Sequence, residues 1–436
     1  MKKHFKELRQ YLLLWSTQSL SALGSGMTGY ALTLWLYQET GSALKTALLQ
    51  ICTYAPYVLM IIFAGALSDR WNKKRIILGC DLFAAMSTVA VLLLALNGRL
   101  EGRHLYLINA VNGLMNTIQR PASDVAATLL IPKEEYQRTS GLRSFSDSLT
   151  SILTPVFATA FFAFGGLGAV IAFDLTTFAA AFLTLSVFIK IPEPETERKS
   201  GTSLLKSAGE GLVWLKSKPA VLYLILFLSG INLVASAHKA VLPAMILSVP
   251  NGGKAVLGMV NAAVGAATLT GSIIVTVLRR PKDRIRTIRL SLLLSMSTEN
   301  FILAFGKTPL LWCIGAVCGW IAIPCMGANL DVILRTEIPP DMQGRVFSCR
   351  NTLQFFTLPL GYCLGGALTD SVFEPYMRGK TGSLLNVWFG SGKGSGAAML
   401  LAVLGLSGVA VCAVFGVLLR GYKWSEAEEH NIEEKT

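Results

Sequence analysis

The sequence has 436 residues, of which 52% are hydrophobic and only 15% are charged, and its formal net charge is +13. This composition is too apolar for an ordinary soluble protein. The positive charge does not indicate nucleic-acid binding, because the sequence has no basic soluble domain to carry it.

About 20 consecutive apolar residues cross a bilayer as a helix, and the sequence contains about twelve such segments. They are expected at 11–37, 44–67, 76–96, 104–130, 142–164, 168–190, 220–247, 254–278, 286–306, 309–334, 346–370 and 396–420. We therefore expect an all-α integral membrane protein with twelve transmembrane helices.

The loops between these spans predict the orientation. The basic start MKKHFKELRQ precedes the first span without a cleavage site, so we expect an uncleaved first helix. Most of the 39 lysines and arginines fall in the segments on the same side as this start. Cytoplasmic loops carry such an excess, so both termini are expected in the cytoplasm and the protein in the inner cell membrane.

A short loop between the second and third spans carries the most informative motif, GALSDRWNKKR. Its notable residues are Gly65, Asp69, Arg70, Lys73 and Lys74. The carboxylate of Asp69 needs a partner in this basic loop, which makes it a candidate gate residue.

The fourth span carries a polar stripe. Asn112, Asn116, Arg120 and Asp124 recur every four residues and therefore share one face of a helix. Such a face avoids lipid and is expected to meet water or another helix.

Two readings of this stripe remain open. Arg143 and Asp147, at the inner start of the fifth span, are also four residues apart. Arg120 and Asp124 either join them in an inner charge network that holds helices together, or Arg120 faces the substrate.

Polar residues on further spans predict a central substrate cavity. The residues assigned to it are Gln18, Asn112, Asn116, Arg120, Asn232, Lys239 and Asn261. Small residues permit close packing of helices that rock. They include Gly265, Gly271, Gly361, Gly365 and Gly366.

Two carboxylates, Asp174 and Glu299, lie toward the outer parts of the sixth and ninth spans. An ionisable residue within a span is a functional hypothesis by default. Each is a candidate proton carrier, and the alternative is a buried acid paired with a neighbour.

A polar segment at 191–219 divides the chain. We expect an N-terminal six-helix bundle at 1–190, a cytoplasmic linker with an amphipathic helix at 191–219, a C-terminal six-helix bundle at 220–420 and an acidic cytoplasmic tail at 421–436. The halves are related, because five residues of the first recur 207 positions later. Asp124, Ile131, Pro132, Arg138 and Arg143 recur as Asp331, Ile338, Pro339, Arg345 and Arg350. The bundles are therefore expected to be pseudo-symmetric.

The sequence contains no recognisable motif of an enzyme or of a cofactor-binding site. The outer segment 371–395 ends in GSGKGSG, but it lacks the Ser or Thr of a phosphate-binding loop and is expected to be a flexible loop. The eight cysteines are scattered, and the four histidines have no ligand spacing. We expect no enzyme activity, no cofactor and no metal.

These motifs together resemble the major facilitator superfamily, most closely its bacterial macrolide-efflux and siderophore-exporter proteins of the drug:proton antiporter type. The resemblance rests on GALSDRWNKKRIILGCD, RPASDVAATLLIP, FDLTTFAAAF and GRVFS and covers about residues 8–420. It implies alternating access of two halves, work as a monomer, and a latch in which Asp69 meets the inner end of the eleventh helix, near Arg345.

Three motifs depart from the family pattern. Asn72 replaces a usual glycine, and asparagine tolerates a left-handed turn. Asn112 stands where proton-coupled drug pumps have an arginine, and Thr154 and Pro155 are what remain of a glycine-rich motif on the fifth helix.

The sequence therefore predicts a secondary active exporter of amphipathic or hydrophobic small molecules, such as macrolide-like drugs, by proton antiport. The expected partners are the substrate, protons and the lipid bilayer. An exporter of an endogenous siderophore, small peptide or lipid is the alternative, and a transporter-like sensor is a third possibility.

Overall fold

The computed structural model describes residues 9–70, 72–131, 136–191, 204–277, 281–339, 342–380 and 382–422. For 61–70, 136–138 and 204–208, and for further positions such as Asp124, the backbone alone is described. The described residues form helices and no strands, which confirms the predicted all-α membrane class. The chain divides into two compact units, of residues 1–41 with 48–201 and of residues 42–47 with 202–436.

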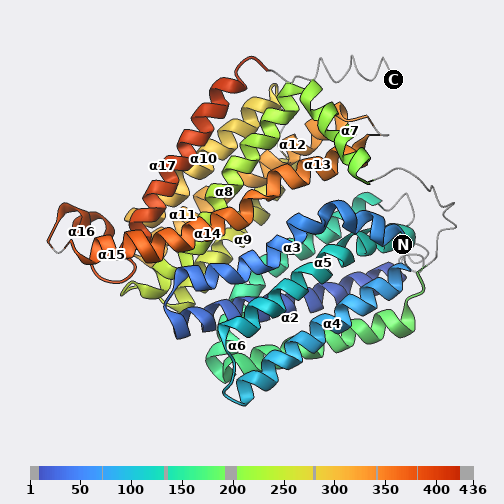
Figure 1. The fold of residues 1–436 in the computed structure, drawn as a ribbon, viewed down its shortest axis with the longest axis horizontal. Coiled ribbons are helices and arrows are strands. Elements are labelled where there is room, and N and C mark those ends of the chain that lie inside the picture. Colours follow the sequence, from blue (N-terminus) through green and yellow to red (C-terminus); the bar gives the residue numbers. More distant parts are fainter. Residues whose placement is uncertain are drawn as a thin grey trace. The chain divides into compact units, whose positions relative to one another are not determined.

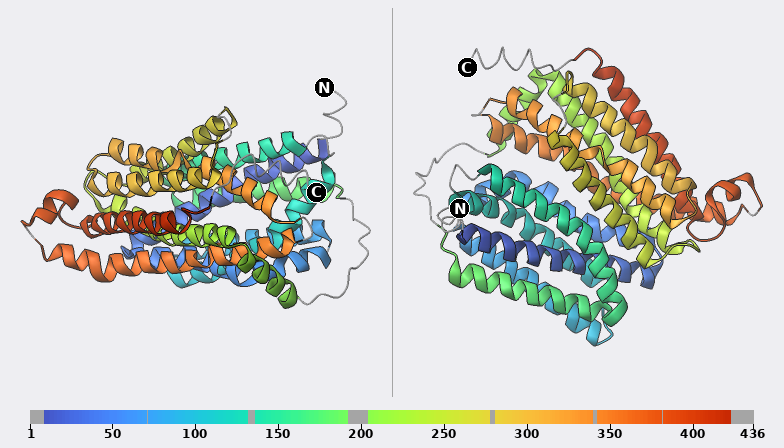
Figure 2. Two further views of the ribbon diagram at one scale, coloured as in Figure 1. Left: turned by 90° about the horizontal axis from the view of Figure 1, so that it is seen from above. Right: turned by 180° about the vertical axis from the view of Figure 1, so that it is seen from behind.

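The first unit consists of long helices that run alongside one another (Figures 1 and 2). They are α2 (Arg9–Thr40), α3 (Ala43–Arg70), α4 (Lys73–Leu96), α5 (Gly102–Leu130), α6 (Tyr136–Leu183) and the π-helical turn η2 (Thr184–Phe188). The first turn of α3, Ser42–Ala47, is grouped with the second unit.

Helix α6 contains two of the predicted spans. Its backbone leaves helical geometry at Gly165 and at Gly166, where φ is +63°. Glycine adopts this left-handed conformation without steric cost, so the chain turns here between the expected spans 142–164 and 168–190.

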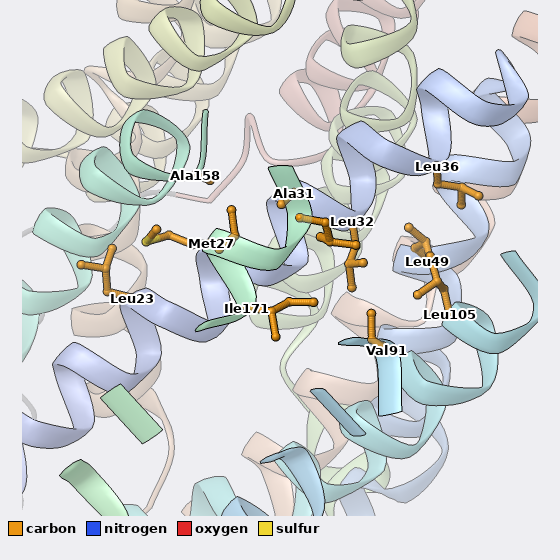
Figure 3. Packing of buried hydrophobic residues seen from close by; sticks show 12 residues of the cluster. Leu23, Met27, Ala31, Leu32, Leu36, Leu49, Val91, Leu105, Ala158 and Ile171 are labelled. Atoms are coloured by element: carbon orange, nitrogen blue, oxygen red, sulfur yellow. The ribbon is translucent and has the colours of Figure 1, made fainter. Parts of the chain in front are cut away.

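Apolar side chains of five helices form the core of the first unit (Figure 3). Met27 and Ala31 of α2 are fully buried against Leu105 of α5 and Ile171 of α6. Leu49 of α3 and Val91 of α4 complete this cluster. The spacing of three to four residues along α2 thus gives one core-facing stripe.

The second unit is also a bundle of long helices (Figure 1). Its elements are α7 (Leu204–Ser217), α8 (Pro219–Ser248), α9 (Lys254–Val277), α10 (Arg284–Phe305), α11 (Pro309–Trp320), α12 (Ile323–Glu337), α13 (Gln343–Phe355), α14 (Thr357–Leu368), η3 (Thr369–Phe373), α15 (Glu374–Arg378), α16 (Leu384–Phe389) and α17 (Ser395–Leu418).

Each predicted span corresponds to a helix, to part of one, or to two consecutive helices. Seven segments of the described chain are long and apolar enough to cross a membrane by length and composition alone. One of them, Phe145–Phe188, contains two predicted spans, and another, Pro309–Leu334, is divided into α11 and α12. The remaining predicted spans lie on α2, α3 and α5 and on the consecutive elements α13, α14 and η3.

Side chains fix where several helices begin. Asn72 Oδ1 accepts the Arg75 N–H at 2.9 Å, and Asp283 Oδ1 accepts the Arg286 N–H at 3.1 Å. Each satisfies a backbone donor that lacks a helical partner. Asn72 has a φ of −59° and caps α4, so it does not adopt the left-handed turn that asparagine tolerates.

The outer segment 371–395 is more ordered than expected. It contains α15 and α16, and Glu374 Oε1 accepts the backbone N–H groups of Gly394 and Ala397 at 3.0 and 3.1 Å. The expected flexible loop is therefore wrong for the described part of this segment, because a buried carboxylate fixes the glycine-rich run at the start of α17.

Candidate functional site

The first unit buries Asp174 of α6 against α2. Its side chain is 4% exposed, and its two oxygens accept hydrogen bonds from Ser25 Oγ at 3.0 Å and Thr28 Oγ1 at 2.8 Å. Gly24 allows this approach, since a β-carbon there would lie 2.9 Å from the Asp174 Cα. The predicted proton carrier is thus a carboxylate held by two hydroxyl donors.

A second carboxylate of the first unit, Asp81 of α4, binds two amides. Gln119 Nε2 donates to Asp81 Oδ1 at 2.6 Å, and Gln18 Nε2 donates to Oδ2 at 3.3 Å. Gln18, which the sequence assigned to the substrate cavity, therefore has a partner on α4 that the spacing did not indicate.

The residues of the polar stripe on α5 differ in how exposed they are. Asn112 Oδ1 is buried without a hydrogen-bond partner among the described residues, whereas Asn116 and Arg120 are exposed. Arg143 and Asp147 of α6 are exposed as well. The side chain of Asp124 lies outside the described residues, so the inner charge network stays a prediction.

The second unit buries Glu299 of α10 in a polar cluster. Trp320 Nε1 donates to Glu299 Oε1 at 2.9 Å, and His238 Nε2 of α8 lies 3.5 Å from the same oxygen. His238 Nδ1 lies 2.8 Å from Asn300 Oδ1. Glu299, His238 and Asn300 are 5%, 6% and 1% exposed.

Sequence reasoning found Glu299 but missed its neighbours. His238 is a titratable residue within a span and directly precedes Lys239, which was the available signal. Trp320 and Asn300 carry no such signal, because a tryptophan or an asparagine in a span has many roles.

Three other predicted cavity residues lie on the second unit. Lys239 is exposed, and its ammonium lies 5.5 Å from the centroid of the Trp320 ring. Asn232 Nδ2 donates to the backbone carbonyl of Gln354 at 2.9 Å, and Asn261 Nδ2 donates to Leu257 O of its own helix. Lys239 is therefore the member of this group that adjoins Glu299.

The gate motif is described in part. The backbone of Gly65, Asp69 and Arg70 lies in the last turns of α3, but the side chains of Asp69 and Arg70 lie outside the described part. Lys73 is buried at 9% exposure. Lys74 Nζ donates to the carbonyls of Ser186 and Ile189 at 2.9 and 2.8 Å. Lys74 therefore binds the C-terminal end of the π-helical turn η2.

Arg345, which the resemblance placed at the gate, pairs with a residue of the linker helix. Its Nη1 lies 2.6 Å from Glu210 Oε2 of α7, and both side chains are 38% exposed. A β-carbon at Gly211 would lie 2.7 Å from Arg345 O, so α7 and α13 approach closely.

Sequence reasoning also missed a cap made by Asp370 of η3. Its carboxylate accepts the backbone N–H groups of Ala43 and Leu44, both at 3.0 Å, and the hydroxyl of Ser42. This carboxylate satisfies the donors at the start of α3, and it explains why the first turn of that helix is grouped with the second unit.

The described residues contain no group of three or more His, Cys, Asp or Glu side chains with the geometry of a metal site. The buried or half-buried carboxylates Asp174, Asp81 and Glu299 accept instead from hydroxyl, amide and indole groups. Such sites bind and exchange protons or position polar parts of a ligand.

Comparison with known proteins gives relatives along most of the chain. Macrolide efflux protein A of Streptococcus pyogenes is 21% identical over 376 residues, which cover 85% of this chain and 92% of that protein. The enterobactin exporter EntS of Citrobacter koseri is 24% identical over 335 residues, 75% of this chain and 77% of that protein.

Solved structures share the fold. A bacterial homologue of the human lysosomal transporter Spinster, inward-facing and occupied, has a TM-score of 0.70 at 15% identity and covers 96% of this chain and 98% of that chain. A bacterial homologue of the iron transporter ferroportin has a TM-score of 0.65 at 15% identity, with 94% and 98% covered.

The model of the Major Facilitator Superfamily matches residues 14–362, which is most of the sequence. Together with the relatives this confirms the resemblance and the multi-pass membrane class, and the family consists of transporters and not of enzymes. The chain belongs to the major facilitator superfamily.

Proposed function

We propose that the protein is a secondary active exporter of amphipathic or hydrophobic small molecules, driven by proton antiport and alternating access. The observation that carries this proposal is the similarity to macrolide efflux proteins over 85% of the chain. Macrolide-like drugs are therefore the first substrate class to test. We propose that it works as a monomer in the inner membrane.

Proton coupling is proposed for Asp174 or Glu299. Both carboxylates are buried, at 4% and 5% exposure, and each belongs to a different unit. Burying a charged carboxylate costs free energy unless the group is hydrogen-bonded or paired with an opposite charge. Binding a proton removes the charge and therefore changes how stable each of these side chains is in its buried position. Full proton-coupled transport by the double variant Asp174→Asn, Glu299→Gln would reject this assignment.

Export of an endogenous siderophore, small peptide or lipid is the second candidate function. The similarity to an enterobactin exporter favours it, as do the exposed cations Arg120 and Lys239, which suit an anionic cargo. Lys239→Ala separates the two candidates: transport of a neutral lipophilic cargo tolerates this change, and transport of an anionic cargo does not.

A growth-inhibition panel in an efflux-deficient bacterial host tests the proposal. The wild type is compared with Asp69→Asn, which removes the carboxylate of the proposed gate formed with Arg70, Lys73, Lys74 and Arg345. Macrolides, other antibiotics, dyes and detergents are used as probes, with both proteins verified in the membrane. Protection by the wild type alone is expected, and no protection by either protein against any compound rejects drug export.

A further inference from the structure

His238 and Asn300 together fix where protons sit on the imidazole ring. The distance of 2.8 Å between His238 Nδ1 and Asn300 Oδ1 is that of a hydrogen bond. The amide oxygen only accepts, so Nδ1 must carry the proton and donate it. This leaves Nε2 of a neutral ring as an acceptor.

That acceptor faces a carboxylate. His238 Nε2 lies 3.5 Å from Glu299 Oε1, which already accepts from Trp320 Nε1. Two lone pairs that face one another repel, so one further proton is required between the two side chains. It resides on the ring, which gives an ion pair, or on the carboxyl group, which gives a neutral pair.

The protein builds an enclosure around this pair. A β-carbon at Gly319 of α11 would lie 2.6 Å from both Cβ and Oε2 of Glu299, and one at Gly405 of α17 would lie 3.1 Å from Asn300 Cβ. These glycines therefore leave room for the two polar residues of α10. Imidazole, carboxyl and amide groups are thereby kept together in a low-dielectric interior.

Few other charges act on the pair. Lys239 of α8 is the charged neighbour of Glu299 besides His238, and α11 contributes the indole of Trp320. The described part of α17 has no charged residue, and α12 meets α10 where Arg284 Nη1 donates to Asn329 Oδ1, at the opposite end of α10.

We infer that His238 and Glu299 form a two-residue proton-binding unit in which Asn300 sets the imidazole tautomer and Trp320 orients the carboxyl group. Loss of the shared proton leaves an imidazole lone pair against a carboxylate and drives the two side chains apart. The role of this unit in transport rests on the proposed proton antiport. His238 is in that case a positioning residue for the proton carrier Glu299.

Nitrogen NMR of the protein labelled with ¹⁵N-histidine, in lipid bilayers, tests the proton placement. The chain has four histidines, and His238→Gln identifies the relevant signal. We expect Nδ1 to be protonated, with Nε2 either protonated or bonded to a carboxyl proton, and the Nε2 signal to change in Glu299→Gln. A bare Nδ1 beside a protonated Nε2 in the wild type would overturn the inference.

The NMR signal of His238 can be assigned with a second variant. If His238→Gln fails to fold, Asn300→Leu removes the acceptor at similar volume and is expected to shift the same signal toward the Nε2–H form. His104→Gln is the matched control, since His104 accepts the backbone N–H of Glu101 away from the cluster. It must leave the His238 signal unchanged.

Transport in proteoliposomes tests the coupling, with a macrolide and a fluorescent dye as probes. His238→Gln is expected to shift the pH of half-maximal transport by about one unit, as loss of a close charge partner does, whereas His104→Gln leaves it unchanged. A proton-coupled wild type with an unshifted His238→Gln profile overturns the inference. A wild type that moves no protons instead rejects the proposed antiport, whatever the NMR result.

Discussion

At the scale of single residues, carboxylates within the predicted spans are held by donors from other helices. Asp174 accepts from Ser25 and Thr28, which lie 149 and 146 positions earlier. Asp81 and Glu299 are bonded in the same manner, to amides and to an indole. Asp174 and Asp81 are thus satisfied by neutral donors, whereas Glu299 has the indole of Trp320 and the imidazole of His238 beside it.

Replacing Thr28 tests this at Asp174. Thr28→Val keeps the shape of the side chain but removes the hydroxyl that donates to the buried carboxylate, so we expect a loss of about 1 kcal/mol or more of stability. Thermal unfolding in detergent measures it.

The control for this substitution lies on the same helix. Thr33 is half-buried, and its hydroxyl donates to Gly29 O one turn away in an exposed hydrogen bond. Thr33→Val is expected to leave the unfolding temperature nearly unchanged. If Thr28→Val and Thr33→Val lower the unfolding temperature equally, the hydrogen bond from Thr28 to Asp174 does not contribute to stability.

At the scale of elements, small residues decide how closely helices pack. A β-carbon at Gly361 of α14 would lie 2.3 Å from Leu233 O of α8, and one at Gly365 would lie 2.5 Å from Ala237 O. The backbones of α8 and α14 are therefore in direct contact along this seam, as the glycines in the sequence suggested.

Gly361→Ala is predicted to disrupt this packing. The added methyl group meets backbone atoms, which cannot move as the end of a flexible side chain does, so folded yield and thermal stability should fall sharply. Gly327→Ala on α12 is the matched change, because nothing lies within 4 Å of the added carbon. It should be neutral or stabilising, since alanine favours helix by about 1 kcal/mol. A tolerated Gly361→Ala contradicts the predicted contact.

Asp370→Ala is predicted to release the start of α3. The carboxylate satisfies the N–H groups of Ala43 and Leu44, so its removal exposes two donors that α3 itself does not satisfy. Amide hydrogen exchange at these two residues should accelerate about tenfold or more, as follows from a loss of about 1.4 kcal/mol.

The same change at another helix start serves as the comparison. Asp283 caps α10 by accepting the Arg286 N–H. Asp283→Ala should accelerate exchange at the start of α10 and leave Ala43 and Leu44 protected. Unchanged exchange at both residues in Asp370→Ala would mean that the cap does not stabilise the first turn of α3.

At the scale of the whole molecule, the distribution of basic residues predicts the membrane orientation. We expect both termini in the cytoplasm, because the basic segments lie on that side. A fluorescent protein fused after Thr436 should fluoresce, and alkaline phosphatase fused within 97–101, between α4 and α5, should be active outside. Reversed activities of these two reporters would overturn the orientation.

Local patterns in the sequence were sufficient for the fold class. Apolar runs of the length of a bilayer predict transmembrane helices without any knowledge of their neighbours, and the helices α2 to α17 confirm the all-α class. Glycine-rich and basic motifs identified the superfamily, which the match over 14–362 confirms. The acids Asp174 and Glu299 stood out because each interrupts an apolar run.

Tertiary structure alone decided what those acids bind. His238 of α8 approaches Glu299 of α10, and Glu210 of α7 pairs with Arg345 of α13, because helices far apart in sequence pack together. Periodicity shows which face of a helix is polar but not which helix that face meets, so the partners were invisible from the sequence. The cap on α3 and the ordered segment before α17 have the same origin, since Asp370 and Glu374 act on backbone groups that only the folded chain brings to them.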